Sequence, residues 1–190
     1  MRKSILLLVI CAAIAGTATR ATAQDADMMK KWMDYMTPGD MHKMLAAMDG
    51  KWSEDVTVWM DPSQPPIKST STSEYKMILG GRYQQSNVSG TFSGMPYESQ
   101  SILAFDNAKK IFIGSWIDNM GTGILALEGP YDPATKTITL TGNETDPTTG
   151  KDTKVRETIK LIDNNTQLIE MYSTTAGKEI KTMEIKAKRM

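Results

Sequence analysis

Apolar and polar residues alternate through most of the chain from residue 51 to residue 190. A period of two places alternate side chains on one face of a β-strand, so these runs predict strands with one buried face. Turn residues such as Asp-Pro and Gly-Gly separate the runs at short intervals, with no helical pattern between them, which favours an antiparallel meander. The apolar runs that share a parity are Trp52, Val56, Val58 and Met60; Ile111, Ile113 and Ile117; Ile138 and Leu140; Val155, Ile159 and Leu161; and Met183, Ile185 and Ala187.

A meander of about eight to ten strands buries its edges best by closing into a barrel, although alternation alone is also typical of a sandwich. The fold class expected here is therefore all-β, with one or two short helices before the first strand. A chain of 190 residues is long enough for one domain with a sizeable core.

Residues 1–23 have the pattern of a secretory signal peptide. Arg2 and Lys3 precede an apolar stretch from Ile5 to Ala15, which is too short to span a bilayer. Small residues at Ala21 and Ala23 predict cleavage before Gln24, with an uncleaved anchor as the alternative. The sequence therefore predicts a periplasmic or secreted protein.

Cys11 lies inside the apolar stretch, where we interpret it as a passive residue; the alternative is lipidation. Cleavage would leave 19 basic against 22 acidic residues and no cysteine. A mildly acidic chain does not suit a nucleic-acid partner, and a chain without cysteine cannot use thiol catalysis. No other apolar run is long enough to predict a membrane span in the mature chain, and the sequence does not indicate an oligomeric state.

Residues 24–48 are rich in methionine and show helical periodicity, with a break at Thr37-Pro38-Gly39. Three interpretations stay open for them: plain apolar packing on the barrel, a flexible lid over an apolar ligand, or a soft-metal site for Cu(I). The ligands of such a metal site would be Met29, Met33, Met36, Met41, His42 and Met44.

A series of short motifs follows in order along the chain: Pro38-x-x-Met41-His42-x-x-Leu45, Gly50-Lys51-Trp52, Gly80-Gly81-Arg82-Tyr83, Trp116-Ile117-Asp118 with Gly121, Tyr131-Asp132, Gly142 with Asp146-Pro147, Met171-Tyr172, and Glu184. Together these motifs resemble the bacterial domain-of-unknown-function family 1579. The resemblance covers residues 38–189 and implies a lipocalin-like (calycin) barrel, here at residues 49–190, with no established activity.

Gly50, Trp52 and Arg189 are the candidate structural residues. Gly50 would allow a tight turn into the first strand, and Trp52 would close the barrel floor. In calycin barrels such a tryptophan often packs under an arginine of the last strand. Arg189 shares its parity with Ile185 and Ala187, so it is the expected partner of the Trp52 ring.

Inside the barrel, parity places Glu157 with Val155 and Ile159, Glu54 with Trp52, and Glu144 after Leu140, unless these acids lie at strand ends. Trp116 has the opposite parity to Ile113 and Ile117, so it would face outward unless a bulge near Gly114 reverses the strand. The candidate ligand-binding residues are Arg82, Tyr83, Trp116, Glu157 and Tyr172.

The chain has one histidine and no recognised catalytic set, so the sequence assigns neither catalytic residues nor a cofactor. The function expected first is an exported protein that binds a small apolar or amphipathic molecule. The alternatives are copper binding through the methionine-rich helices, a purely structural or interaction module, and a small-molecule enzyme.

Overall fold

The structure is a computed structural model that describes residues 24–61, 63–175 and 177–190. The expected signal peptide, with Cys11, lies outside the described residues. The chain divides into two compact units, Met1–Thr37 and Pro38–Met190. Residues 24–36 of the first unit are helical, and the side chains of Met29, Met33 and Met36 are exposed on that helix.

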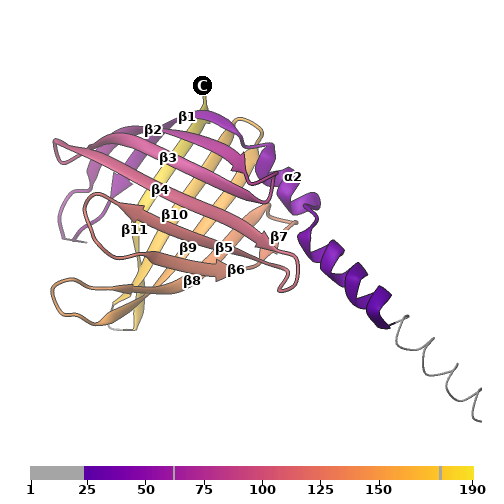
Figure 1. Cartoon of the computed structure of the whole chain (residues 1–190). Coiled ribbons are helices and arrows are strands. Elements are labelled where there is room, and N and C mark those ends of the chain that lie inside the picture. The colour runs from indigo at the N-terminus through magenta and orange to yellow at the C-terminus, as the bar shows by residue number, and fades with distance from the viewer. Residues whose placement is uncertain (1–23, 62, 176) are drawn as a thin grey trace, which may run out of the picture. The chain divides into compact units, whose positions relative to one another are not determined.

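In the described part of the second unit, one short helix precedes eleven strands (Figure 1). The elements are α2 (Asp40–Ala46), β1 (Gly50–Val58), β2 (Ile67–Ile78), β3 (Tyr83–Phe92), β4 (Met95–Asp106), β5 (Ile111–Asp118), β6 (Leu125–Gly129), β7 (Tyr131–Asp132), β8 (Thr137–Thr145), β9 (Asp152–Asp163), β10 (Thr166–Thr175) and β11 (Lys178–Arg189).

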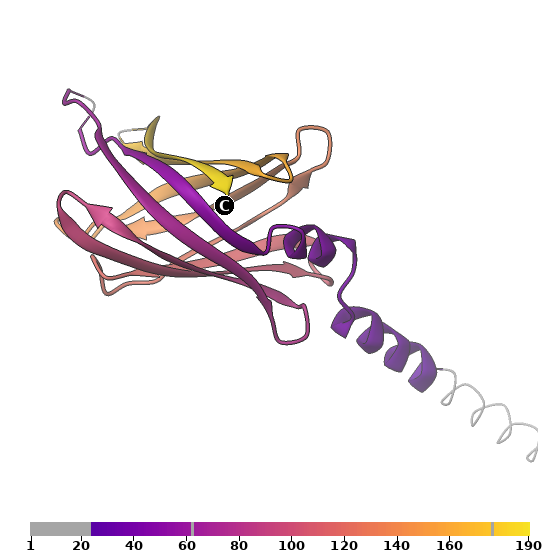
Figure 2. The same ribbon diagram turned by 90° about the horizontal axis from the view of Figure 1, so that it is seen from above.

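These described strands form one antiparallel sheet, in the order β6-β5-β4-β3-β2-β1-β11-β10-β9-β8-β7. β6 also pairs with β8, so ten strands close into a barrel and the two-residue β7 lies beside β8. Figures 1 and 2 show the strands tilted around a common axis. The predicted closed antiparallel barrel is confirmed, and so is the helical segment before it.

The closing pair of strands, β6 and β8, approach each other closely because glycines lie on them. A Cβ atom on Gly142 would lie 2.4 Å from the Ala126 carbonyl oxygen, and one on Gly129 would lie 2.0 Å from the Thr139 carbonyl oxygen. Both distances are far below van der Waals contact, so a larger residue at either position would push the two strands apart.

The helix α2 lies at one end of the barrel (Figure 2). Leu45 points into the core, and its carbonyl oxygen accepts a hydrogen bond of 2.7 Å from Gln84 Nε2 of β3. Helix α2 is therefore attached to the barrel by both apolar packing and a buried hydrogen bond. The core around Leu45 consists of Phe112, Leu127, Ile138, Leu140, Val155 and Met171.

Strand β5 has the opposite orientation to the one its isoleucines predict. Phe112 is fully buried and Trp116 faces the interior, whereas Ile117 is 45% exposed. The register with β4 is continuous across Gly114, so no bulge reverses the strand. The prediction that Trp116 faces outward is therefore wrong, because β-branched residues also suit an outer strand face while the interior takes the bulkier aromatic rings.

Two further parity predictions fail where strands end. Met60 follows the last residue of β1 and is 74% exposed, although it shares the parity of Trp52. Glu144 is exposed at the end of β8, not inside the barrel. Alternation carries no information on side-chain direction once the pleated backbone ends.

Candidate functional site

The barrel encloses a cavity of about 320 Å³ whose two walls differ in chemistry. The wall formed by β2, β3 and β4 contributes hydroxyl groups, whereas β6 and β8 to β11 contribute mainly aliphatic side chains. Such an amphipathic interior can enclose an apolar body and hydrogen-bond a polar group on the same molecule. The serines of β2 to β4 are Ser69, Ser71, Ser86, Ser99 and Ser101, and Ser115 of β5 also lines the cavity; the aliphatic wall includes Leu125, Leu127, Leu140, Ile159, Ile169, Met183 and Ile185.

Glu54 of β1 is the acidic residue of the polar side. Its side chain is almost fully buried, and Oε2 accepts a hydrogen bond of 2.6 Å from Ser71 Oγ. Tyr75 of β2 lies close by: burial raises the pKa of its hydroxyl, and the negative charges of Glu54 and Glu157 raise it further. The Tyr75 hydroxyl is thus within electrostatic reach of both carboxylates, which places the two acids around one part of the cavity.

Glu157 of β9 faces the same cavity, as its alternation with Val155 and Ile159 predicts. Burial raises the pKa of its carboxyl group to about 7. Within the described part of the chain, no side chain forms a hydrogen bond or an ion pair with it. Glu157 is partly buried and faces the cavity, and a carboxylate withdrawn from bulk water is normally paired, so Glu157 is a candidate contact for a molecule inside the barrel.

Two buried hydrogen-bond donors on the cavity wall also lack an acceptor among the described residues: Trp116 Nε1 and Gln167 Nε2. Burial raises the pKa of Tyr97, and polar contacts with Ser99 and Trp116 oppose this shift. Gln167 is 3% exposed and lies on β10 beside Ala187, whose other neighbour across the sheet is Glu54. A buried donor without an acceptor costs roughly 1–3 kcal/mol, which a ligand or water oxygen would offset.

The cavity reaches the surface at the end opposite α2. Asp118 and Met120 line it there, and Met120 is 45% exposed. Asp118 Oδ1 accepts a hydrogen bond of 2.9 Å from the Met120 N–H and so holds the turn after β5. Met60, Met95 and Ile124 are exposed in loops or strand ends at this same end. Access to the cavity is therefore at this end of the barrel, where Met120 is the exposed apolar residue on its lining.

The floor near α2 is built around Trp52 and Arg189. Trp52 is fully buried and its Nε1 donates to the Met48 carbonyl oxygen at 3.0 Å. The Arg189 guanidinium lies 4.6 Å from the centroid of the Trp52 ring and donates to the carbonyl oxygens of Asp49, Ala47 and Asn164. Gly50 has φ +128°, a region that favours glycine, and a Cβ there would lie 3.0 Å from the Arg189 guanidinium.

Of the five sequence-predicted ligand residues, the structure brings Trp116 and Glu157 together at the cavity. Arg82 and Tyr83 are exposed at the β2–β3 hairpin, where Arg82 donates to the Leu79 carbonyl oxygen at 3.1 Å. Tyr172 lies on the outer face of β10. There the Arg156 guanidinium packs 4.0 Å from its ring centroid and also pairs with Glu179.

The methionine-rich segment is divided between the two units. Met29, Met33 and Met36 belong to the first, and Met41, His42 and Met44 to the second. Met41 and Met44 pack against the core. The described residues contain no group of three or more histidine, cysteine, aspartate or glutamate side chains that could hold a metal ion.

His42 has a packing role in α2. It is buried, its ring lies edge-on to Phe105, and its Nδ1 accepts a hydrogen bond of 3.0 Å from the Gly39 N–H. Burial lowers the pKa of the imidazole, and a hydrogen bond with the Phe105 backbone opposes this shift. The ring thus already has partners at the start of α2.

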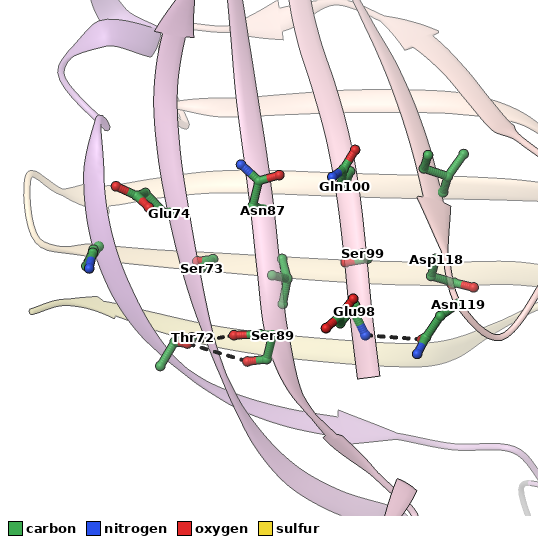
Figure 3. Close-up of a pocket in the computed structure, with 13 residues that line it drawn as sticks. Thr72, Ser73, Glu74, Asn87, Ser89, Glu98, Ser99, Gln100, Asp118 and Asn119 are labelled. Carbon is green, nitrogen blue, oxygen red and sulfur yellow. Dashed lines mark hydrogen bonds between the residues drawn. The ribbon is translucent and has the colours of Figure 1, made fainter. Parts of the chain in front are cut away.

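A wide polar groove of about 670 Å³ lies on the outer face of β1 to β5. Figure 3 shows Glu74, Asn87 and Gln100 side by side on three neighbouring strands, with Thr72 bonded to Ser89 below them. These side chains are exposed and water can satisfy them. The enclosed cavity, in contrast, holds buried polar groups without partners, so we take it as the candidate site.

Gln167 and the serines of β2 to β4 were absent from the residues predicted for the site. Parity offered a signal for Gln167, because it shares a face with Ile169 and Met171 on β10. On β2 the inward-facing positions include Ser69, Ser71 and Ser73. Because this inner face is polar, a search for alternating apolar residues does not detect it.

These features define a closed β-barrel protein with an internal cavity. The chain belongs to the family described as "Protein of unknown function (DUF1579)", whose model matches residues 37–189, and this confirms the resemblance seen in the sequence.

Among solved structures, Rv2717c from M. tuberculosis is similar with 12% identity and a TM-score of 0.60, covering 81% of this chain and 99% of that one. A redesigned β barrel also matches, with 14% identity and a TM-score of 0.41, covering 80% and 99% of the two chains. No curated protein matches the chain. The likeness to Rv2717c supports the barrel fold alone.

Proposed function

We propose that this protein is exported and that its lipocalin-like barrel binds a small amphipathic molecule in the internal cavity. The observation that carries the proposal is the cavity itself: about 320 Å³ of enclosed space, with an aliphatic wall, a hydroxyl-rich wall and a buried Gln167 amide without an acceptor. A barrel built only for stability would fill this space with side chains. None of the described helices combines the length and apolar character needed to cross a bilayer.

Two substitutions on β4 test the binding site. Ser101 faces the cavity, and its neighbour Gln100 faces the outer groove. Ser101→Leu should fill part of the cavity and abolish binding, whereas Gln100→Leu should leave binding unchanged. Native mass spectrometry of the full chain would detect a co-purifying small molecule released on denaturation. The intact mass would also show whether the chain begins at Gln24.

Ligand binding and export, the two parts of the proposal, are tested by separate outcomes. A wild-type protein that carries no additional mass, and an occupancy that Ser101→Leu leaves unchanged, would each contradict binding inside the barrel. Retention of residues 1–23 in the recovered protein would contradict export. Loss of the bound molecule in Gln100→Leu but not in Ser101→Leu would move the site to the outer groove.

A further inference from the structure

The cavity is acidic without a compensating positive charge. Its titratable side chains are Glu54 on β1, Tyr75 on β2, Tyr97 on β4, Asp118 on β5 and Glu157 on β9. No lysine, arginine or histidine among the described residues lines it. An interior that carries carboxylates and no cation is electrostatically incomplete, because each ionised carboxylate needs an opposite charge or several donors.

Basic side chains on β9 and β11 already form ion pairs on the outer face of the barrel. Arg156, next to Glu157 in sequence, forms two hydrogen bonds with the Glu179 carboxylate, at 2.8 and 2.7 Å. Lys181 pairs with Glu170 and Glu184. Because neighbouring residues on a strand point to opposite faces, Arg156 cannot turn inward to neutralise Glu157 without leaving the sheet.

Glu157 and Glu54 differ in the hydrogen-bond donors available to their carboxylates. Glu54 accepts a hydrogen bond from Ser71 Oγ, whereas Glu157 has no such donor among the described residues. Both carboxylates act on Tyr75, so a positive charge placed beside Glu157 would also be attracted by Glu54. An anionic ligand would face repulsion from both acids, and a neutral one would leave Glu157 without a counter-charge.

We propose that the ligand is an amphipathic amine, whose protonated nitrogen is held by Glu157 while its apolar body lies against the aliphatic wall of β6 and β8 to β11. This inference rests on the proposed function and adds the charge of the ligand. Trp116 and Tyr97 line the same space and supply aromatic surface, which favours a cation over a neutral group.

Three probes with one apolar body test the charge preference: 4-phenylbutylamine, 4-phenylbutanol and 5-phenylpentanoate. Isothermal titration calorimetry with the full chain near neutral pH should show the amine binding at least about tenfold more tightly than the alcohol, and no binding of the carboxylate. Glu157→Gln should weaken amine binding by about tenfold or more and leave alcohol binding unchanged. The matched control is Glu74→Gln in the outer groove, which should change neither.

The proton balance gives an independent readout. Because the carboxyl group of Glu157 has a pKa of about 7, amine binding should release protons near neutral pH, and the affinity should fall as the pH drops toward about 5. Proton release is measured by titration in buffers of different ionisation enthalpy, and Glu157→Gln should abolish it. Asp118 at the mouth, with its hydrogen bond to Met120, is tested by Asp118→Asn, which should keep the proton release.

Equal affinity for the three probes, or amine binding that Glu157→Gln leaves unchanged, would overturn the amine proposal while binding in the cavity stands. Absence of amine binding at about 1 mM would overturn it as well. The proposed function is judged separately, by the co-purifying molecule and its loss in Ser101→Leu. Circular dichroism of each variant shows whether the barrel has folded.

Discussion

The floor of the barrel and its cavity both contain charged or amide groups, but they differ in how far the protein supplies partners for them. On the floor, Arg189 donates to three backbone carbonyl oxygens and packs on Trp52, and Oδ2 of Asp49 accepts from the Met77 N–H at 2.9 Å, which leaves Asp49 Oδ1 as the floor's unpartnered atom among the described residues. In the cavity, Glu157 and Gln167 have no partner among the described residues. The floor therefore has the features of a structural site, whereas the unpartnered groups of the cavity are what supports the proposed ligand site.

Arg189→Ala should have the largest effect on stability, because it removes the contacts that hold the floor of the barrel together. It removes a cation–π contact and leaves carbonyl oxygens around the floor without donors, so the free energy of unfolding should fall by about 3 kcal/mol. Urea denaturation measures the change. Arg156→Ala removes an exposed ion pair on the outer face and should cost less than about 1 kcal/mol. Equal losses for both variants would show that the floor contact contributes no more than a surface pair.

Glu157→Gln should have the opposite sign, and raise the free energy of unfolding, because it replaces a partly buried carboxylate that faces the cavity. A carboxyl group with a raised pKa in the folded state favours folding when protonated and opposes it when ionised. Stability should therefore fall as the pH rises from about 4.5 to about 7, and stay level above that. At about pH 8 the variant should be more stable than the wild type by about 2 kcal/mol, with the difference lost near about pH 4.5.

Denaturation midpoints at both pH values measure this difference. Glu144→Gln is the matched control, because Glu144 is exposed at the end of β8 and its substitution should change stability little at either pH. A wild type and a Glu157→Gln variant with the same pH profile would show that the carboxyl group is solvated as in the unfolded chain.

The sequence predicted the barrel floor more completely than the cavity. Trp52 and Arg189 could be paired because the resemblance to a calycin barrel supplied the long-range register, which the structure shows as direct partners on β1 and β11. Glu157 followed from strand parity alone. Arg82, Tyr83 and Tyr172 were chosen by residue type, but their side of the sheet depends on strand ends and on the irregularity at Met171 and Tyr172.

Trp116 illustrates the limit of alternation. Both faces of β5 carry large apolar residues, so the pattern could not decide which face is inner, and only the closed barrel settles it. The polar wall was hidden for the opposite reason. Ser71 and Ser73 lie on an inner face without an apolar signal, and their burial depends on strands that are distant in sequence.

Two buried glutamines that both line the cavity provide the finest comparison, because Gln84 at the α2 end has a protein partner and Gln167 does not. Gln84 is 5% exposed and its Nε2 donates to the Leu45 carbonyl oxygen at 2.7 Å, whereas the Nε2 of Gln167 has no acceptor in the described chain. Gln84→Leu should lower the free energy of unfolding by about 1 kcal/mol. The loss is modest because the Leu45 carbonyl oxygen also accepts from the Met48 N–H at 2.9 Å.

Gln167→Leu should instead raise the free energy of unfolding by about 1 kcal/mol, because leucine has a similar volume and removes a buried amide without a partner. The two variants change the same chemical group in the same barrel, so opposite signs in urea denaturation isolate the effect of the missing partner. A loss of stability in both would show that water satisfies Gln167. In that case Gln167→Leu should also leave the occupancy of the co-purifying molecule unchanged, whereas a direct ligand contact predicts that it falls.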